Sequence, residues 1–277
     1  MQKLITIAIG ICMMALGATA QVKMPAPSTT QTLKQDFGLG TIELTYSRPN
    51  AKGRKVFGDL VPYGKLYRTG ANAATRLRFT EPMEIGGKKI DSGTYVIYTI
   101  PEEESWEIII NKGIDNWGID GYKESQDVHR FKLAPIKLKT KLETFTMQFN
   151  NVQPESCELH IMWEKTGVAI PITVNIKEKI RTQLEAAMLT DKKPYFQAAQ
   201  FYNEYDNNKT KALDYANKAT IANPKAYWIW LYKARLQKDL GDVAGAKESA
   251  TKSMELAKED KNDDYVKMNQ ELLRKLK

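Results

Sequence analysis

The sequence predicts an all-β antiparallel sandwich followed by an all-α segment of helical repeats. From Thr30 to Ile176, apolar and polar residues alternate with the period of half-buried strands, and Gly, Pro and Asp interrupt the runs. From about residue 177 the apolar residues recur with the period of an amphipathic helix, and a 34-residue internal repeat follows. Many short strands with few helical stretches between them are typical of a sandwich.

Residues 1–20 have the pattern of a secretory signal peptide. Lys3 precedes an apolar run that ends at Gly17, and Ala18-Thr19-Ala20 forms a small-x-small cleavage site before Gln21. The apolar run is shorter than the roughly 20 residues that a membrane-spanning helix needs. We therefore expect an exported protein, periplasmic or extracellular, with no membrane span after cleavage.

The net charge restricts the classes of partner, and the number of cysteines restricts how the fold can be stabilised. The formal net charge is +8, and Lys3 is the only charged residue that cleavage would remove. This modest positive balance favours anionic partners such as surface polymers, while export argues against nucleic acid. Cys12 lies inside the signal peptide after a bulky residue, which argues against a lipid anchor. Cys157 would remain alone, so the mature chain has no intramolecular disulfide and depends on packing for its stability.

The predicted sandwich covers residues 25–176. A first hairpin surrounds Gly38-Leu39-Gly40, and Gly86-Gly87 has the composition of a two-residue hairpin turn. Further strands are expected over residues 95–100, 106–110, 128–138, 142–149, 159–163 and 169–176. Residues 48–74 and 111–127 interrupt the alternation and predict two long loops. Long loops on the rim of a sandwich are where function is most often placed.

The helical part begins with a predicted connecting helix over residues 177–190, in which Ile180, Leu184 and Met188 share one face. Within residues 192–277, small residues and a turn residue recur 34 positions apart: Ala212, Ala216, Ala219 and Asn208 match Ala246, Ala250, Ser253 and Asp242. This period resembles the tetratricopeptide repeat, whose small side chains let paired helices pack closely. Asn223-Pro224 closes the first repeat as that family expects, whereas Lys258 replaces the proline of the second. We expect two such repeats and a C-terminal capping helix.

Most catalytic signatures are absent from the sequence. It contains no Gly-rich phosphate loop, no Gly-x-Ser-x-Gly elbow, no His-Glu-x-x-His and no Cys-x-x-Cys. The aspartates of residues 115–121 do not have the spacing of a calcium loop. The two histidines, His129 and His160, fall in predicted strands, where a histidine is more often an ordinary residue than a ligand. We predict no metal and no cofactor.

Residues 48–78 are strongly cationic, with eight Lys and Arg residues against the single acid Asp59. A guanidinium presents a planar fork of donors that suits carboxylate, phosphate or sulfate. The stretch therefore predicts a pocket for an anionic or carbohydrate ligand, and its candidate residues are Arg48, Arg54, Tyr63, Arg68 and Asn72. The alternative is that the arginines pair with carboxylates such as Glu43, Glu143 or Asp127 and only fix the loop.

The same stretch resembles a family of uncharacterised secreted bacterial proteins, catalogued as domain of unknown function 2911. The similarity rests on Tyr46-Ser47-Arg48-Pro49, Leu60-Val61-Pro62-Tyr63-Gly64-Lys65 and Arg68-Thr69-Gly70-Ala71-Asn72, and it continues through Trp117-Gly118 and Trp163-Glu164. It covers most of residues 25–176. Tyr67 stands where the family pattern has tryptophan. The family carries no assigned activity, so the resemblance implies that these residues form one domain and implies no function for it.

Resemblance to tetratricopeptide repeats also implies a groove for a protein partner. The groove residues would be Trp228, Leu231, Arg235, Lys238 and Asp239, with Lys193, Gln200 and Asn203 as approximate counterparts in the first repeat. Grooves of this type bind an extended peptide or a partner helix. The alternative is that two repeats are too few for an independent groove and dock on the sandwich or on another copy of the chain.

Two functions fit the sequence. The first is a binding or scaffold protein of the cell envelope without enzymatic activity, in which the sandwich holds a polar or anionic ligand and the repeats hold a protein. The second is a hydrolase of envelope carbohydrate that uses Asp127, Glu143 or His129 as acid or base. A glycosidase needs two carboxylates about 5–10 Å apart across a cleft, which sequence spacing does not establish.

The mature protein is predicted to begin at Gln21 and to leave the cytoplasm, because the charge, the apolar run and the cleavage site occur together. N-terminal sequencing of protein from its native source should give Gln21 as the first residue. An intact Met1 on a cytosolic protein would contradict both the signal peptide and the exclusion of nucleic acid.

Overall fold

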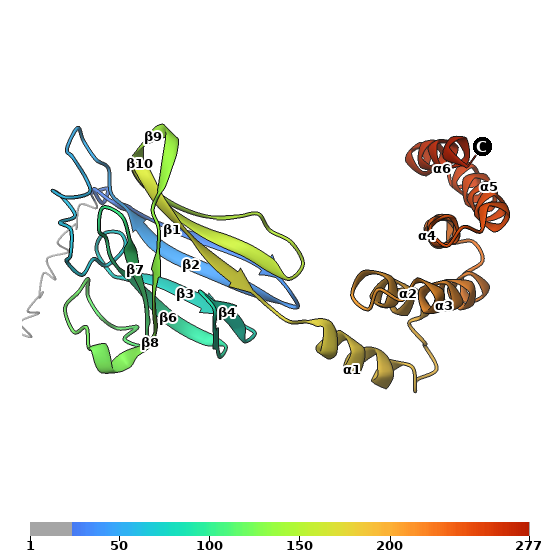
Figure 1. The fold of residues 1–277 in the computed structure, drawn as a ribbon, viewed down its shortest axis with the longest axis horizontal. Helices are drawn as coiled ribbons and strands as arrows, with labels where there is room; N and C mark the ends of the chain where they lie inside the picture. Colours follow the sequence, from blue (N-terminus) through green and yellow to red (C-terminus); the bar gives the residue numbers. More distant parts are fainter. Residues whose placement is uncertain (1–23, 277) are drawn as a thin grey trace, which may run out of the picture.

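The computed structural model describes residues 24–276, so the predicted signal peptide lies outside the described residues. Within that range the chain forms two antiparallel sheets followed by six helices, which confirms the expected fold class. Figure 1 shows the sheets together at one end of the molecule and the helices extending away from them in a curved row. None of the described helices is long and apolar enough to cross a membrane.

The larger sheet has the strand order β1-β2-β3-β6-β7-β8. Its strands are β1 (Thr29–Phe37), β2 (Gly40–Arg48), β3 (Thr75–Phe79), β6 (Gly93–Ile100), β7 (Trp106–Asn111) and β8 (Asp127–Leu133). The smaller sheet has the order β5-β4-β10-β9, with β4 (Met83–Ile85), β5 (Lys88–Ile90), β9 (Ile136–Asn150) and β10 (Ser156–Thr173). Gly86 and Gly87 form the expected β4–β5 turn with φ angles of 57° and 83°, a conformation that glycine adopts at little cost.

The last two strands differ from the sequence expectation. We expected separate strands over 159–163 and 169–176, but β10 runs unbroken from Ser156 to Thr173 against β9. The polar residues between the two apolar runs are accommodated by register shifts around Glu164, which has a φ of 50°. A bulge of this kind lets a strand bend without ending, so a break in the apolar alternation does not mark a strand end here.

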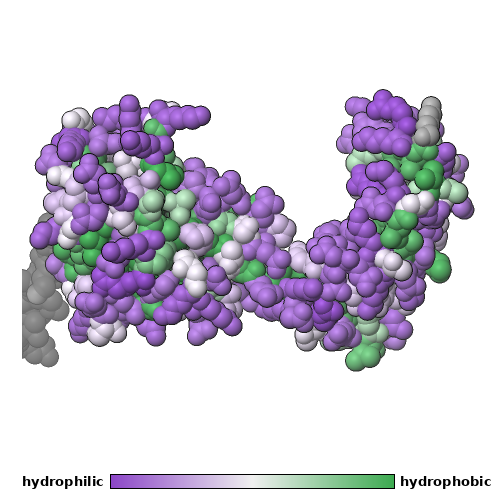
Figure 2. All heavy atoms as spheres, viewed as in Figure 1, coloured by the Kyte–Doolittle hydropathy of each residue, from purple (hydrophilic) through white to green (hydrophobic). Residues whose placement is uncertain are grey.

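The main core lies between the two sheets. Trp106, Trp163, Phe145, Ile42 and Ile85 are all at most 1% exposed in it. In β3 the burial alternates strictly, so that Arg76 and Arg78 point to the opposite, outer face of the larger sheet. On the face shown in Figure 2, hydrophilic side chains cover most of both parts, and hydrophobic ones form smaller patches between them.

A second, smaller apolar cluster lies on the outer face of the larger sheet. It contains Ala74, Val96, Tyr98 and Ile109, with Tyr122 packed against it. Because β6 is buried on both faces, its central residues read as a continuous apolar run rather than an alternating one. The two long loops that the sequence predicted supply the cover, since Ala74 belongs to the first and Tyr122 to the second.

The chain that follows β2 seals the free edge of β9. Three hydrogen bonds satisfy backbone groups of that edge: Phe145 N–H to Pro49 O (2.8 Å), Ala51 N–H to Glu143 O (2.8 Å) and Met147 N–H to the Tyr46 hydroxyl (2.9 Å). An unpaired edge strand would leave these groups open to water or to another chain. The first residues of the segment that carries the family resemblance therefore have a structural role, because they pair with the edge of β9 and join the two sheets. We call them the sealing segment.

Helix α1 (Lys177–Ala187) connects the sheets to the remaining helices. It ends at Ala187, where we expected residue 190, because the Thr190 hydroxyl donates to the Ala187 carbonyl (2.8 Å) and closes a turn. Lys177 Nζ and Arg181 Nη2 lie 2.9 and 2.8 Å from Asp206 Oδ1, and these hydrogen bonds lower the pKa of the Asp206 carboxyl. The helix is thus tied to the helical part by ion pairs more than by a buried apolar face.

The other helices pack on one another in chain order. They are α2 (Tyr195–Glu204), α3 (Lys209–Ala222), α4 (Tyr227–Asp239), α5 (Val243–Glu259) and α6 (Asp263–Lys275). Asn208 and Asp242, which are 34 positions apart, each cap the next helix by accepting a backbone N–H. The extra turn residue of the first helix pair is Asn207, which has a φ of 51°. The small residues of the 34-residue register are fully buried at the helix crossings, including Ala212 and Ala246 at 0% exposure.

Replacing Ala212 or Ala246 by leucine should destabilise the helical part by roughly 1–3 kcal/mol, because the crossings have no room for three more carbons. Ala222→Leu and Ala244→Leu are matched controls, since these alanines are exposed on the same two helices. Thermal and urea unfolding of the four variants provides the measurement. If the buried variants unfold like the controls, the crossings are looser than the structure shows.

Candidate functional site

Two of the predicted ligand-binding arginines bind the protein's own backbone. Arg48 Nε donates to the Phe145 carbonyl at 3.2 Å, and Arg48 Nη2 donates to Thr146 Oγ1 at 3.2 Å. Arg54 Nε and Nη2 donate to the carbonyls of Ala51 and Asn50, both at 2.9 Å. Neither side chain forms an ion pair with a described carboxylate. These arginines hold the sealing segment in place, which is neither the anion pocket nor the carboxylate pairing that the sequence suggested.

Tyr63 lies in a different environment from the arginines. Its ring packs against Gly58, where an added Cβ would come within 2.8 Å of Tyr63 Cε2. Partial burial raises the pKa of the Tyr63 hydroxyl, and the neighbouring carboxylates Glu103 and Glu102 raise it further. An acidic neighbourhood does not suit an anion, so Tyr63 is separated from the candidate pocket both by position and by charge.

Arg68 and Asn72 do lie together, beside Gly118 of the second long loop. An atom at the Cβ position of Gly118 would be 3.4 Å from Arg68 Nη1 and 3.6 Å from the Asn72 carbonyl oxygen. The Asn72 side-chain amide donates to Ser47 Oγ (3.3 Å) and the Ser28 carbonyl (3.2 Å). The structure therefore brings together two of the five predicted site residues.

Residues 67–75 form a tight, strained turn. Thr69 and Asn72 have φ angles of 54° and 59°, which cost non-glycine residues of order 1–3 kcal/mol each. Gly70 is required by space as well, because a Cβ there would lie 2.9 Å from the Ser47 carbonyl oxygen. The Thr75 hydroxyl fixes the turn by donating to the buried Thr69 carbonyl at 2.5 Å. Strain that the surrounding structure enforces in this way is typical of functional sites.

A cavity of about 440 Å³ opens next to this turn on the outer face of the larger sheet. Its lining is mixed: Thr30, Thr45, Ser47, Asn72 and Arg76 contribute polar groups, and three alanines and two aromatic residues contribute apolar surface. Trp117 closes one side, and 65% of its surface is exposed. The sequence marked the loop of Trp117 as a long insertion in the sandwich but did not place this residue in the site. An exposed tryptophan in such a loop is the signal that would have found it.

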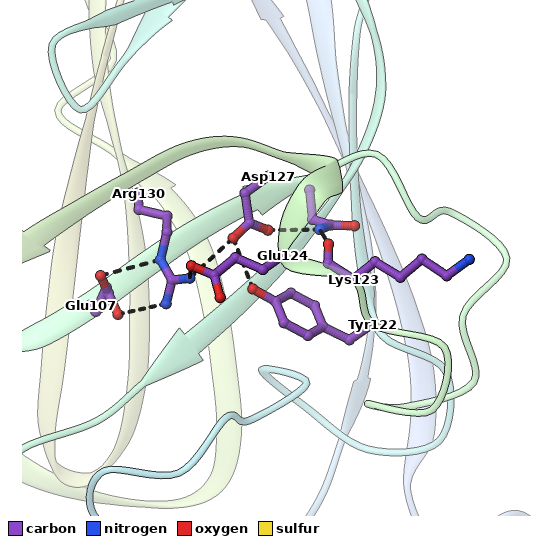
Figure 3. A network of polar contacts seen from close by, with 7 residues as sticks. Glu107, Tyr122, Lys123, Glu124, Asp127 and Arg130 are labelled. Atoms are coloured by element: carbon purple, nitrogen blue, oxygen red, sulfur yellow. Dashed lines mark hydrogen bonds and ion pairs between the residues drawn. The ribbon is translucent and has the colours of Figure 1, made fainter.

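A partly buried network of polar contacts holds the loop that carries Trp117 (Figure 3). Asp127, whose side chain is 7% exposed, accepts hydrogen bonds from Asn111 Nδ2 (2.7 Å), the Tyr122 hydroxyl (2.8 Å) and Arg130 Nη1 (3.2 Å). Arg130 also grips Glu107 through two nitrogens, and these hydrogen bonds raise the pKa of the guanidinium. Burial and the Asp127 carboxylate raise the pKa of Tyr122, which keeps its hydroxyl protonated as a donor.

Comparison with family models decides which family the sandwich belongs to. A model described as "Protein of unknown function (DUF2911)" matches residues 28–172, more than half of the chain. The chain belongs to the DUF2911 family. Comparisons with curated proteins and with solved structures found no match. The matched range holds both sheets, the sealing segment, the strained turn and Trp117, and it ends before α1.

Within the DUF2911 domain, each of the three residues considered for hydrolysis has a partner in the protein itself. Asp127 accepts hydrogen bonds from three donors, as described above. Glu143 belongs to β9 in the other sheet and accepts the Lys52 N–H at 2.6 Å. His129 contacts the Gly86 carbonyl at 3.1 Å and stacks on Phe131. No group of three or more His, Cys, Asp or Glu residues between 24 and 276 is arranged to hold a metal ion.

Outside the DUF2911 domain, the predicted groove residues separate into three environments. Leu231 is 2% exposed and packs in the helical core, so it is not available to a partner. Trp228 is 44% exposed beside a cavity of about 410 Å³ between α4 and α5. Arg235, Lys238 and Asp239 line a different cavity of about 310 Å³, between α4 and α6.

The proposed counterparts in the first repeat also differ from one another. Lys193 is exposed in the chain before α2, while Gln200 and Asn203 are half-buried within α2. Asp239 is already paired with Lys209, whose Nζ lies 2.7 Å from Asp239 Oδ2. The surface that remains for a partner is therefore centred on Arg235 and Lys238.

Asp127→Ala should lower the free energy of unfolding of the DUF2911 domain by about 2–3 kcal/mol, because three donors lose a partly buried, charged acceptor. Asp120→Ala is the matched control, since Asp120 is exposed in the same loop and makes no ion pair among the described residues. Urea unfolding provides the measurement. Equal midpoints for the two variants would mean that the network does not fasten the loop.

Proposed function

We propose that this protein is an exported, two-part binding protein of the cell envelope. The outer face of the sandwich takes a polar or anionic ligand of the carbohydrate kind. The helical part is a tetratricopeptide-like array that docks a protein partner. The chain would thereby link a saccharide of the envelope to a protein, without performing a reaction on either.

The proposal rests mainly on the exposed Trp117 beside a cavity of mixed polar and apolar lining. A tryptophan ring offers a flat apolar face to the C–H groups of a sugar ring, while hydroxyl, amide and guanidinium groups hydrogen-bond the sugar hydroxyls. Asn72, Arg76 and the hydroxyls of β1 and β2 supply such groups here. The volume of about 440 Å³ falls within the range of roughly 300–1,000 Å³ that is usual for small-ligand sites.

The register of the helices supports the second half of the proposal. Helix caps at Asn208 and Asp242 and fully buried small residues both recur at 34 positions, which is the length of a tetratricopeptide repeat. The cavity between α4 and α6 is lined by the half-buried Met268, by the cations Arg235, Lys238 and Lys275, and by Asp239 and Glu271, of which Asp239 is paired with Lys209. A mixed apolar and cationic surface of this kind suits an acidic, extended segment of a partner.

Export rests on the first twenty residues and on the net positive charge of the chain. The hydrolase alternative has less support. A general acid or base must reach the proton it transfers. The contacts of Asp127, Glu143 and His129 engage each of them in structural roles, in two different sheets.

Titration of the mature protein, residues 21–277, with a panel of neutral and acidic oligosaccharides tests the proposal. At a hundredfold excess over its dissociation constant, a bound saccharide should stabilise the protein by about 2.7 kcal/mol, visible as a higher Tm. Trp117→Ala and Arg76→Ala should lower the affinity at least tenfold by calorimetry. The absence of binding by every saccharide in the panel would refute the carbohydrate site.

Two matched controls accompany these variants. Ile119→Ala removes another exposed apolar side chain of the same loop, and Arg78→Ala removes the next outward arginine of β3, which does not line the cavity. Both should bind as the wild type does. A loss of affinity equal to that of the site variants would mean that the effect is not specific to the cavity.

A further inference from the structure

Arg68 differs from the other arginines of its segment in having no partner. Arg48 and Arg54 each donate to two protein oxygens, whereas the Arg68 side chain makes no hydrogen bond or ion pair with any residue between 24 and 276. Its Nε atom is shut off from solvent and is unpaired. Buried charged donors without a partner are rare, and each one calls for an explanation. This guanidinium has lost part of its hydration without gaining a counter-charge.

The Arg68 side chain lies where the strained turn meets the second long loop. Nη1 lies beside Gly118, which has no side chain to cover it, and a Cβ at Gly118 would be 3.4 Å from that nitrogen. Gly118 directly follows Trp117 and lies beside Asn72, so Arg68 adjoins the part of the chain that lines the cavity. The φ of +65° at Gly118 favours glycine, so the position beside Nη1 stays without a side chain.

The charged side chains at the site are all cationic. Arg76 lines the cavity and Arg68 lies next to it, while no carboxylate is among the described residues of its lining. A neutral sugar would leave both positive charges without compensation. A carboxylate or sulfate on the sugar would supply charge-assisted hydrogen bonds, which are about twice as strong as neutral ones.

We infer that the ligand of this site is an acidic saccharide, whose ring lies on Trp117 and whose oxyanion binds the terminal nitrogens of Arg68. The inference rests on the proposed carbohydrate site and adds the class of sugar. Arg68 binds the negative charge, Trp117 contacts the sugar ring, and Arg76 adds a second cation at the cavity. A uronic acid, which carries a carboxylate directly on the ring, has both features within one residue.

The test compares saccharides that differ only in charge. Galacturonate trimer and a glucuronate-containing disaccharide are each titrated against their neutral methyl esters, using calorimetry on the mature wild-type protein. The acidic form should bind roughly ten- to a hundredfold more tightly, the range expected for charged hydrogen bonds. Raising the salt concentration should weaken only the acidic form.

Arg68→Gln should lower the affinity of the acidic saccharide at least tenfold and leave the ester's affinity unchanged, and Arg68→Lys should restore part of the loss. Equal affinities of acid and ester for the wild type would overturn the inference while the carbohydrate site stands. No binding of either form would overturn the carbohydrate site, and the inference with it. Sulfate or acetate binding as tightly as the acidic saccharide would also overturn it, since the ring would then contribute nothing. The wild-type comparison decides the matter even if Arg68→Gln does not fold.

Discussion

The free edge of β9 is the constraint on which the rest of the sandwich depends. A long edge strand with unpaired backbone groups is open to pairing with other chains. Here the segment after β2 covers it, with the Tyr46 hydroxyl at Met147 and backbone bonds from Pro49 and Ala51. Arg48 and Arg54 serve the same seal by donating to backbone carbonyls. The first part of the cationic stretch, around Arg48 and Arg54, therefore has a structural role, and the candidate ligand site is formed by later residues of the stretch, Asn72 and Arg76.

The same seal places the candidate site. The Ser47 carbonyl lies so close to Gly70 that no side chain fits there, and Ser47 Oγ accepts a hydrogen bond from Asn72. The strained turn over residues 67–75 is thereby fixed on the outer face of the larger sheet. The second long loop is fastened to the same face by Asp127 and carries Trp117 to the edge of the cavity. A site whose side chains are held by independent contacts is organised before its ligand arrives, which reduces the entropy lost on binding.

The sequence predicted those features that follow from local chemistry. The Gly86-Gly87 turn needs positive φ angles, and the 34-residue register needs small residues at crowded crossings, so both could be read from residue type alone. The course of β10 could not be read from residue type, because a bulge lets the strand continue through polar residues. The site was predicted in part. Arg68 and Asn72 belong together, but composition does not distinguish an arginine that binds a backbone carbonyl, such as Arg48, from one left free for a ligand.

The central claim is that the cavity beside Trp117, and not the arginine-rich seal, binds the ligand. Isotope-labelled protein titrated with galacturonate trimer tests it directly, because the side-chain N–H groups of arginine and tryptophan are visible by NMR. The account predicts that the Arg68 Nε–H and Trp117 indole N–H resonances shift together and saturate, while those of Arg48 and Arg54 stay in place. Shifts confined to Arg48 and Arg54, with Trp117 unchanged, would contradict it.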